Sequence, residues 1–525
     1  MFVFQTPGLC TADILIPASA VDLQKWAVVA CDQYAAQPAY WQKVAAYVGD
    51  APSMLHCILP ECYLTPEQIP PRVAHIVQHL DTYLKDGTLQ SLGHGVMFVR
   101  RRVPQGIREG LVLAVDLEAY NYSPDSQTPI RATEGTILSR IPPRMEIRKG
   151  AAAEAPHIML LFDDPQDDVM SAARQGVLGP ACQCPGAPTA PIGPASADED
   201  AASATVQIAP CSACENATSP TYQTELMMDS GSIEGFFIQD KSLLARLDAA
   251  LLGVIGPGES PMPFAVGDGN HSLATAKACW EEIKKGLTPQ AQATHPARHC
   301  LVELVNIHSP ALTFEPIHRV VFGVSAETLV RALGESCRQT VAQGPEEMCQ
   351  PASAESCQPT LLLTPLAPGA APAVPLNGWH MVGDGLLEIT LARTGDTSRP
   401  AGVPFGRGEG SRTPAFDDVA PPDEESLLDS RHAAHPDDAP RLGVLQSLLD
   451  AAIAQFPDAE VEYVHGRQDL LDICRERNAV GFLLPTLPKS TLFEAVRRDG
   501  PLPRKTFSLG EADDKRFYLE LRQLM

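Results

Sequence analysis

The sequence has no apolar run approaching the roughly 20 consecutive residues that a transmembrane helix needs. It also lacks the pattern of a secretory signal, because Met1–Gly8 contains no basic residue ahead of an apolar run. Together these absences point away from membrane insertion and secretion. We therefore expect a soluble, cytoplasmic protein with no membrane partner.

Basic residues are scarce relative to acidic ones. The 525 residues include 40 lysines and arginines against 64 aspartates and glutamates, which gives a net charge of −24. Such a surface repels nucleic-acid phosphates, and no helix-turn-helix pattern or internal repeat stands out, so nucleic acid is not an expected partner. The sequence also lacks a P-loop and the glycine spacing of a dinucleotide-binding fingerprint.

The 14 cysteines do not suggest disulfide bonding. Most stand inside apolar segments, as buried reduced thiols do. One group differs, because two close pairs separated by a loop are able to hold zinc or to pair as redox thiols: Cys182 with Cys184, and Cys211 with Cys214. The surrounding tract is rich in Pro, Ala, Gly and Asp, and the single residue between Cys182 and Cys184 is not the commonest spacing in a zinc ribbon. We therefore do not expect zinc there.

Two stretches without periodicity interrupt the chain, at residues 175–220 and 395–440. Both are rich in proline and in small and acidic residues, so we interpret them as low-complexity, disordered inserts. The rest alternates short apolar runs with helical patterns, which predicts a mixed α/β fold around a mixed sheet. We predict an N-terminal α/β region (1–174), a central region (221–394) and a C-terminal α/β segment (441–525) that packs on the core.

The motif around which we expect the chain to be organised begins with a short buried strand, Phe264 to Val266. A helix follows, with one apolar face formed by Leu273, Ala276, Trp280 and Ile283. The polar bend between them consists of Gly267, Asp268, Gly269, Asn270, His271 and Ser272.

This bend has the residue types of an anion site. Ser272 is the expected N-cap of the helix, whose first N–H groups and partial positive charge suit a phosphate. Asp268 and His271 are candidates for metal binding or proton transfer. An ordinary turn is the alternative, because a bend needs positive φ and a cap even where no ligand binds.

Further candidates lie in a polar stretch between Arg131 and Arg144. The guanidinium groups of Arg131, Arg140 and Arg144 suit phosphate or carboxylate, and Glu134 is a candidate general base. A solvated loop with salt bridges explains the same residues.

Asp163 and Asp164 follow the apolar strand His157–Phe162. Together with phosphate oxygens they would suit Mg²⁺, and they equally suit a turn that starts a helix. Lys505 belongs to a basic stretch near the C-terminus that is a candidate anion-binding surface.

Several of these segments together resemble one bacterial and archaeal family. They are Arg131–Thr136, Arg140–Arg144, His157–Pro165, Val266–Ser272, Phe314–Arg319, Lys489–Thr491 and Pro503–Phe507. The likeness covers nearly the whole chain apart from the inserts, and the family is catalogued as domain of unknown function 1015. This resemblance implies relatedness and leaves the activity open.

The central motif, commonly Asp-Gly-His-His-Arg in that family, is similar to the phosphate-binding motif of ParB/sulfiredoxin-like proteins. That group includes free-serine kinases, CTP-hydrolysing partition proteins and sulfiredoxin. Asp268 and Gly269 match, His271 matches the second histidine, and Asn270 and Ser272 replace His and Arg. The resemblance implies a nucleotide-binding element here. The lost arginine would be replaced by Lys277, which leans toward the helix N-terminus, or by Arg131, Arg140 or Lys505.

The function we expect is that of a nucleotide- and magnesium-dependent phosphotransferase acting on a small hydroxylated metabolite. ATP or ADP would bind at the bend, with Mg²⁺ on Asp268, Asp163 or Asp164 and with Glu134 deprotonating the acceptor. His271 would contact a phosphate or move a proton. The alternative is a nucleotide-binding switch without turnover. DNA partition fits an acidic chain poorly, and sulfiredoxin-like repair lacks a reactive cysteine beside the motif.

Overall fold

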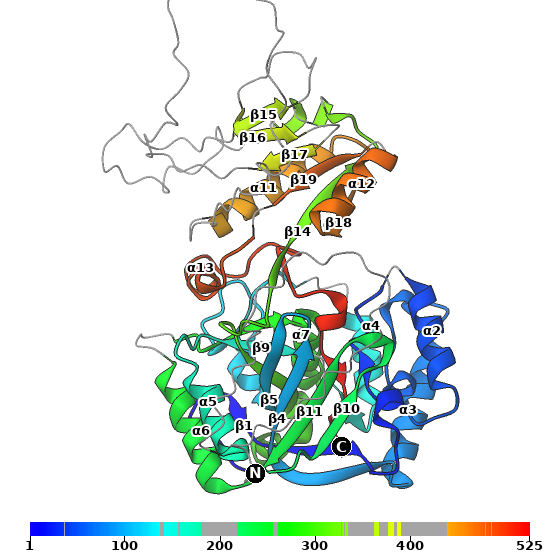
Figure 1. The fold of residues 1–525 in the computed structure, drawn as a ribbon, viewed down its shortest axis with the longest axis vertical. Coiled ribbons are helices and arrows are strands. Elements are labelled where there is room, and N and C mark those ends of the chain that lie inside the picture. The colour runs from blue at the N-terminus through cyan, green and yellow to red at the C-terminus, as the bar shows by residue number, and fades with distance from the viewer. Residues whose placement is uncertain are drawn as a thin grey trace, which may run out of the picture. The chain divides into compact units, whose positions relative to one another are not determined.

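The computed structural model describes the following residues: 1–35, 37–136, 141–155, 158–179, 218–255, 261–326, 328–329, 331–333, 362–366, 376–382, 386–389, 438–477, 479–484 and 486–524. The chain divides into two compact units, shown in Figure 1. Unit 1 comprises Met1–Glu315 and Lys489–Met525, and unit 2 comprises Pro316–Pro488. Most of both predicted inserts lies outside the described residues. The helix α5 ends at Leu178, a few residues past the predicted start of the first insert.

The described part of unit 1 is built on a 13-stranded mixed sheet. Its strands are β1 (Leu9–Cys10), β2 (Ala12–Pro17), β4 (Leu89–Val103), β5 (Gly106–Asp116), β6 (Tyr120–Asn121), β7 (Ile130–Ala132), β8 (Ala153–Glu154), β9 (Met159–Phe162), β10 (Tyr222–Glu225), β11 (Ser232–Ile238), β12 (Phe264–Asp268), β13 (His299–Asn306) and β22 (Leu521–Gln523). The main order is β6-β7-β12-β9-β13-β5-β4-β2-β22-β8. In addition, β1 pairs with β5, and β11 lies between β4 and β10.

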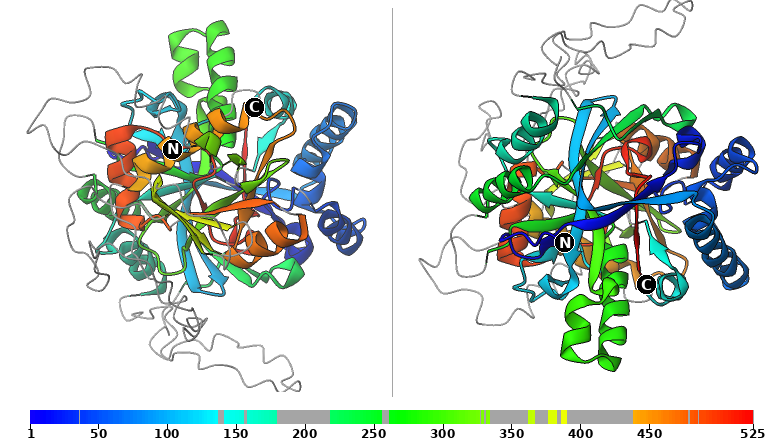
Figure 2. Two further views of the ribbon diagram at one scale, coloured as in Figure 1. Left: turned by 90° about the horizontal axis from the view of Figure 1, so that it is seen from above. Right: turned by 90° about the horizontal axis from the view of Figure 1, so that it is seen from below.

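Helices flank this sheet. In unit 1 they are α1 (Leu23–Trp26), α2 (Pro38–Val48), α3 (Ile69–Lys85), α4 (Ile141–Gly150), α5 (Asp168–Leu178), α6 (Lys241–Gly253), α7 (Asn270–Ile283), α8 (Pro289–Thr294) and α13 (Leu492–Asp499). Figures 1 and 2 show α2 and α3 on one side of the sheet and α5 and α6 on the other. Of all described helices, none combines the length and apolarity that crossing a bilayer requires.

Alternating side chains along the strands fill two separate cores. Val96 and Phe98 of β4 face a core with α5, α6 and α7. Met97 and Val99 face the other core, shared with α1, α2 and α3. Because both faces of the sheet are covered, the central strands are nearly continuous apolar runs, and this is why they could be recognised in the sequence.

The C-terminal segment crosses the face of the sheet that packs against α1, α2 and α3. Two short strands belong to it, β20 (Phe507–Leu509) and β21 (Phe517–Tyr518), and β21 pairs with β3 (Val28–Val29). The segment ends in β22, which pairs with both β2 and β8. The structure therefore brings the last residues of unit 1 next to its first strands and over the central part of its sheet.

Unit 2 has its own smaller sheet, with the order β15-β16-β17-β19-β14-β18. The strands are β14 (Phe314–Phe322), β15 (Leu362–Leu366), β16 (Leu376–Val382), β17 (Leu386–Ile389), β18 (Glu460–His465) and β19 (Val480–Leu483), with helices α11 (Asp438–Ile453) and α12 (Arg467–Arg477). Apolar residues of β14 and β19 pack against α11 on one side and α12 on the other. The mixed α/β class predicted from the sequence is confirmed.

Candidate functional site

The central motif forms a strand, a tight bend and a helix. β12 ends at Asp268, Gly269 adopts a left-handed conformation with φ of 78°, and α7 begins at Asn270. A Cβ atom on Gly269 would lie 3.1 Å from Ile158 Cα, and one on Gly267 would lie 2.7 Å from Leu161 Cγ. Both glycines are therefore required by close packing, and Gly269 also by its backbone conformation.

The predicted N-cap was wrong. Gly269 occupies the N-cap position, so Ser272 is the third residue of α7 and lies inside the first turn. A glycine in the left-handed region can start a helix without a side-chain cap. The preference for serine at the N-cap position therefore gave the wrong residue here. The predicted apolar face is confirmed for Leu273, Ala276 and Trp280, which are buried.

Asp268 is paired with a lysine from the C-terminal segment. Lys515 Nζ lies 3.3 Å from Asp268 Oδ2 and donates a hydrogen bond to Ser508 Oγ at 2.9 Å. Lys515 is 5% exposed, so its charge acts in a poorly solvated environment. Lys515 was not among the candidate residues predicted from the sequence. Its contact with Asp268 is tertiary, and the only signal was its place in a basic stretch.

Asn270 is buried beside Thr133, the residue that follows β7. The Thr133 hydroxyl donates to Val266 O, and Asn270 Nδ2 donates to Thr133 Oγ1 at 3.4 Å. Asn270 is 9% exposed, and its Oδ1 has no hydrogen-bond partner among the described residues. A buried carbonyl oxygen without a donor is uncommon and indicates a missing donor or cation.

Glu134 follows Thr133 and is held by the C-terminal segment. Its two carboxylate oxygens accept the N–H groups of Lys505 at 3.1 Å and Thr506 at 3.0 Å. The Leu502 N–H donates a hydrogen bond to Thr133 O, in the same loop, at 2.7 Å. Burial raises the pKa of Glu134 above its ordinary value, although the Lys505 charge and the N–H groups oppose that shift.

Arg131 lies on β7, directly beside Ala265 of β12. Its guanidinium donates to Thr128 O at 3.0 Å and to Gln127 Oε1 at 3.3 Å. Burial lowers the pKa of Arg131, and the nearby positive charge of Arg497 lowers it further. The structure thus places Arg131, Thr133 and Glu134 along the strand and loop next to the central motif.

The two candidate magnesium ligands after β9 lie elsewhere. β9 is antiparallel to β12, so Asp268 pairs with Met159 at the start of β9 while Asp163 follows its end, roughly 13 Å away along the strand. Asp163 Oδ1 contacts His308 Nε2 at 2.7 Å, and the buried Asp164 accepts the N–H of Val169 at 2.9 Å. Asp164 therefore serves as a helix-starting residue of α5.

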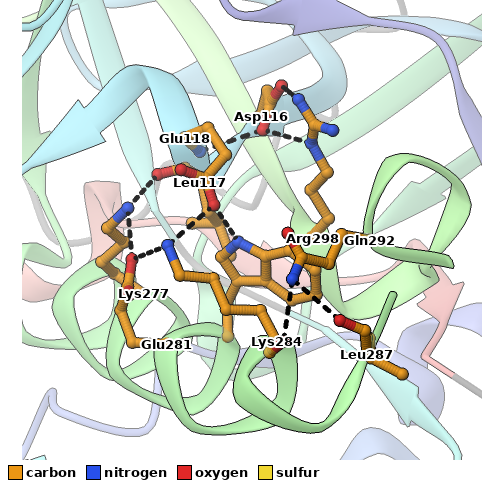
Figure 3. A network of polar contacts seen from close by, with 10 residues as sticks. Asp116, Leu117, Glu118, Lys277, Glu281, Lys284, Leu287, Gln292 and Arg298 are labelled. Atoms are coloured by element: carbon orange, nitrogen blue, oxygen red, sulfur yellow. Dashed lines mark hydrogen bonds and ion pairs between the residues drawn. The ribbon is translucent and has the colours of Figure 1, made fainter. Parts of the chain in front are cut away.

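Lys277 is also directed away from the bend. Figure 3 shows its amine donating to Leu117 O at 2.8 Å and paired with Glu281 at 2.9 Å, within a polar network that includes Glu118 and Lys284.

The remaining candidates lie in other surroundings. Arg144 pairs with Glu61. Arg140 and the four cysteines of the predicted zinc alternative lie outside the described residues. His271 is half-buried, and its carbonyl accepts the Thr275 hydroxyl at 2.7 Å.

No group of three or more His, Cys, Asp or Glu side chains suited to a metal occurs in the described part of the chain. Asp268 and the Asn270 Oδ1 atom supply two oxygens at the start of α7, which is the ligand type that Mg²⁺ accepts when phosphates and water complete its shell.

A family model described as a protein of unknown function (DUF1015) matches residues 15–183 and 186–366, more than half of the chain. The chain belongs to the DUF1015 family. No curated protein and no solved structure gives a match. The DUF1015 match covers the central motif, Arg131 and Glu134, but it stops before Lys515. The likeness of the motif to ParB/sulfiredoxin-like proteins stays a hypothesis.

Proposed function

We propose that this DUF1015 protein binds a nucleotide and Mg²⁺ at the start of α7 and transfers a phosphoryl group to a small hydroxylated metabolite. The observation that carries the proposal is the buried Asn270 Oδ1 without a partner, two residues after Asp268. An unpartnered amide oxygen close in sequence to a carboxylate offers the oxygen ligands that a hydrated Mg²⁺ ion accepts, and the N–H groups at the helix start suit the phosphates that accompany it.

The surrounding charges fit such a ligand. Lys515, 3.3 Å from the Asp268 carboxylate, would share its charge with a phosphate oxygen once Mg²⁺ binds the aspartate. Phosphoryl transfer depends mainly on positioning and charge neutralisation, so a lysine, a helix start and a metal ion are the kinds of group that it needs.

Glu134 is the proposed general base. Its raised pKa brings it nearer to neutrality, where a base transfers protons efficiently. The acceptor hydroxyl would give its proton to Glu134 as its oxygen bonds to the terminal phosphorus and the nucleoside diphosphate leaves. The two N–H groups that bind the carboxylate stabilise its charged form and so lower its basicity, which works against this role.

That opposition favours a second candidate function, nucleotide binding without turnover. Both oxygens of Glu134 are bonded to the C-terminal segment, which gives the side chain a structural role of its own. If Glu134 only holds that segment and does not act as a base, the site binds a nucleotide without turnover. The protein would then be a nucleotide-dependent switch.

The experiment is to incubate the purified protein with ATP, ADP or CTP, Mg²⁺ and a pool of hydroxylated metabolites, and to follow nucleotide binding and product formation. We expect turnover to fall at least about a hundredfold in Asp268→Asn and in Asn270→Ala. Lys285→Met, which changes an exposed residue beyond the end of α7, is the matched control. Saturable binding without product supports the switch, and absence of nucleotide binding overturns both functions.

A further inference from the structure

A cavity of about 170 Å³ lies in unit 1, lined by residues of α3, α4, β8 and the first turns of α7. Much of its wall is aliphatic, formed by Leu59, Leu64, Ile76, Leu80, Ile147 and Ile158. An engineered apolar cavity of about 150 Å³ binds benzene, so this one has room for roughly six to eight non-hydrogen atoms. The occupant it suits is therefore small and largely apolar.

Two arginines of α4 enter this apolar wall. Arg144, Ile147 and Arg148 line the cavity together, because residues three and four apart share one face of a helix. Arg144 is paired with Glu61, which also lines the cavity. Arg148 is paired with Glu154 of β8.

The charge around Glu154 is not balanced. Its carboxylate also accepts Arg522 Nε at 3.0 Å and Nη2 at 2.8 Å, and the N–H of Leu301 at 3.1 Å. Although burial opposes its ionisation, Arg148 and Arg522 hold the pKa of Glu154 below its ordinary value, so it is a carboxylate. Two guanidinium groups thus share a single negative charge, and one positive charge is left over.

The second guanidinium nitrogen of Arg148, Nη2, is buried and has no nitrogen or oxygen partner among the described residues. The thiol of Cys300, which also lines the cavity, is its sulfur neighbour and accepts a weak hydrogen bond from Arg148. A buried guanidinium donor is costly to leave unpaired, and a charged acceptor is the partner that stabilises it most. An anion with a single charge, placed against the part of Arg148 that lines the cavity, would balance the excess charge.

We propose that this cavity binds a small aliphatic monocarboxylate, with its carboxylate on Arg148 and its alkyl group against α3 and Ile147. The aliphatic wall and the small volume disfavour a nucleotide or a sugar phosphate, and the single excess charge disfavours a dianion. Binding of the acid does not depend on the proposed phosphotransfer. Ser272 and Thr275 place α7 in the wall of the cavity, so the two ligands would contact the same helix.

The test is calorimetric titration of the full chain with 4-methylpentanoate, and with the neutral 4-methylpentanamide as the matched ligand. We expect saturable binding of the acid with a Kd below about 1 mM, and binding of the amide at least about tenfold weaker because it lacks the charge. Equal affinities for acid and amide, or no saturable binding of the acid, would overturn the proposal.

Substitutions test whether 4-methylpentanoate binds in this cavity. Arg148→Met keeps the length of the side chain and leaves Glu154 paired with Arg522, and we expect it to weaken acid binding at least about tenfold. Ile76→Phe fills the cavity and should abolish binding, whereas Arg475→Met, at an exposed position in unit 2, should change nothing. If either Arg148→Met or Ile76→Phe folds and binds the acid with unchanged affinity, the proposed site is wrong.

A second measurement needs no variant. Cys31 lines the cavity and is half-buried, so bound 4-methylpentanoate should slow its alkylation by iodoacetamide, followed by mass spectrometry of the Cys31 peptide. The amide at the same concentration should protect less. An alkylation rate that is indifferent to saturating acid counts against the proposal even where the variants fail to fold.

Discussion

Replacing Glu303 by glutamine tests a buried ionic network that joins the sheet of unit 1 to its C-terminal segment. Glu303 lies on β13 and is 1% exposed. Its Oε2 accepts Arg516 Nη1 at 2.6 Å, and its Oε1 lies 3.8 Å from Arg108 Nε. Gly110 leaves room for this carboxylate, because a Cβ there would come within 2.5 Å of Oε1.

The expected cost is large because buried arginines surround the carboxylate. Arg108 and Arg516 are both buried, and the charge of the buried Arg101 also acts on Glu303. Glu303→Gln keeps the shape of the side chain but removes the negative charge that faces these guanidinium groups. Removing one partner of a buried ion pair typically costs about 3–5 kcal/mol, and we expect the free energy of unfolding of unit 1 to fall by that amount.

The assay is urea denaturation followed by circular dichroism. Glu303→Gln should lower the midpoint while the slope stays the same, since the change affects stability and not the surface exposed on unfolding. Glu146→Gln, at an exposed side chain of α4, should remain within about 0.5 kcal/mol of the parent. A midpoint for Glu303→Gln equal to that of the control would refute this reasoning.

The pH dependence offers a second check on Glu303. Burial opposes its ionisation, but Arg516 and Arg108 outweigh this and hold its pKa below the ordinary value of 4.5. A lowered pKa means that Glu303 contributes its full stabilisation above pH 4.5, which is lost as the pH falls through the folded-state pKa. Glu303→Gln should therefore lose less stability than the parent on acidification below that value, and an identical acid response would contradict the assignment.

Three further outcomes are expected. Gly269→Ala should destabilise unit 1 by about 1–2 kcal/mol in denaturant unfolding, because alanine is strained at φ of 78°; an unchanged midpoint would mean that the bend relaxes. Trp280→Phe should cost about 1 kcal/mol by removing the indole N–H that Glu118 accepts at 2.5 Å, and a double variant with Glu118→Gln should show coupling. Burial, with Arg319 nearby, lowers the pKa of His318 to about 4, and its Nδ1 accepts the Leu484 N–H at 3.1 Å. Unit 2 should therefore lose stability as the pH falls from 6.5 toward 4, and His318→Asn should remove that part of the dependence.

The elements around the site could be predicted from sequence because their signals are local. The apolar run that became β12 and the helical spacing of α7 are visible within about twenty residues of sequence, and the structure confirms both. Arg131 and Glu134 were selected for their chemistry, and parallel pairing of β7 with β12 brings them near the motif. Nothing in the sequence indicated that pairing.

Tertiary contacts account for most of what the sequence missed. Lys515 reaches Asp268 only because the C-terminal segment crosses the sheet. Asp163 and Asp268 both end apolar runs, and only the antiparallel register of β9 and β12 shows that they lie at opposite ends of the paired strands. The aliphatic cavity could not be predicted either, since its walls come from elements that lie far apart in the sequence.

The pairing of β22 with β2 has a consequence for synthesis of the protein. Leu521 lies opposite Leu15, so the sheet of unit 1 gains its last strand only after residue 523 has left the ribosome. At about 5–20 residues per second, the roughly 500 residues between these two strands take roughly 25–100 s to translate, and during that time the edge of β2 lacks β22. Glu303 likewise lacks Arg516 until the C-terminal segment has been made. Nascent chains of this protein should therefore depend on chaperones until β22 has been made.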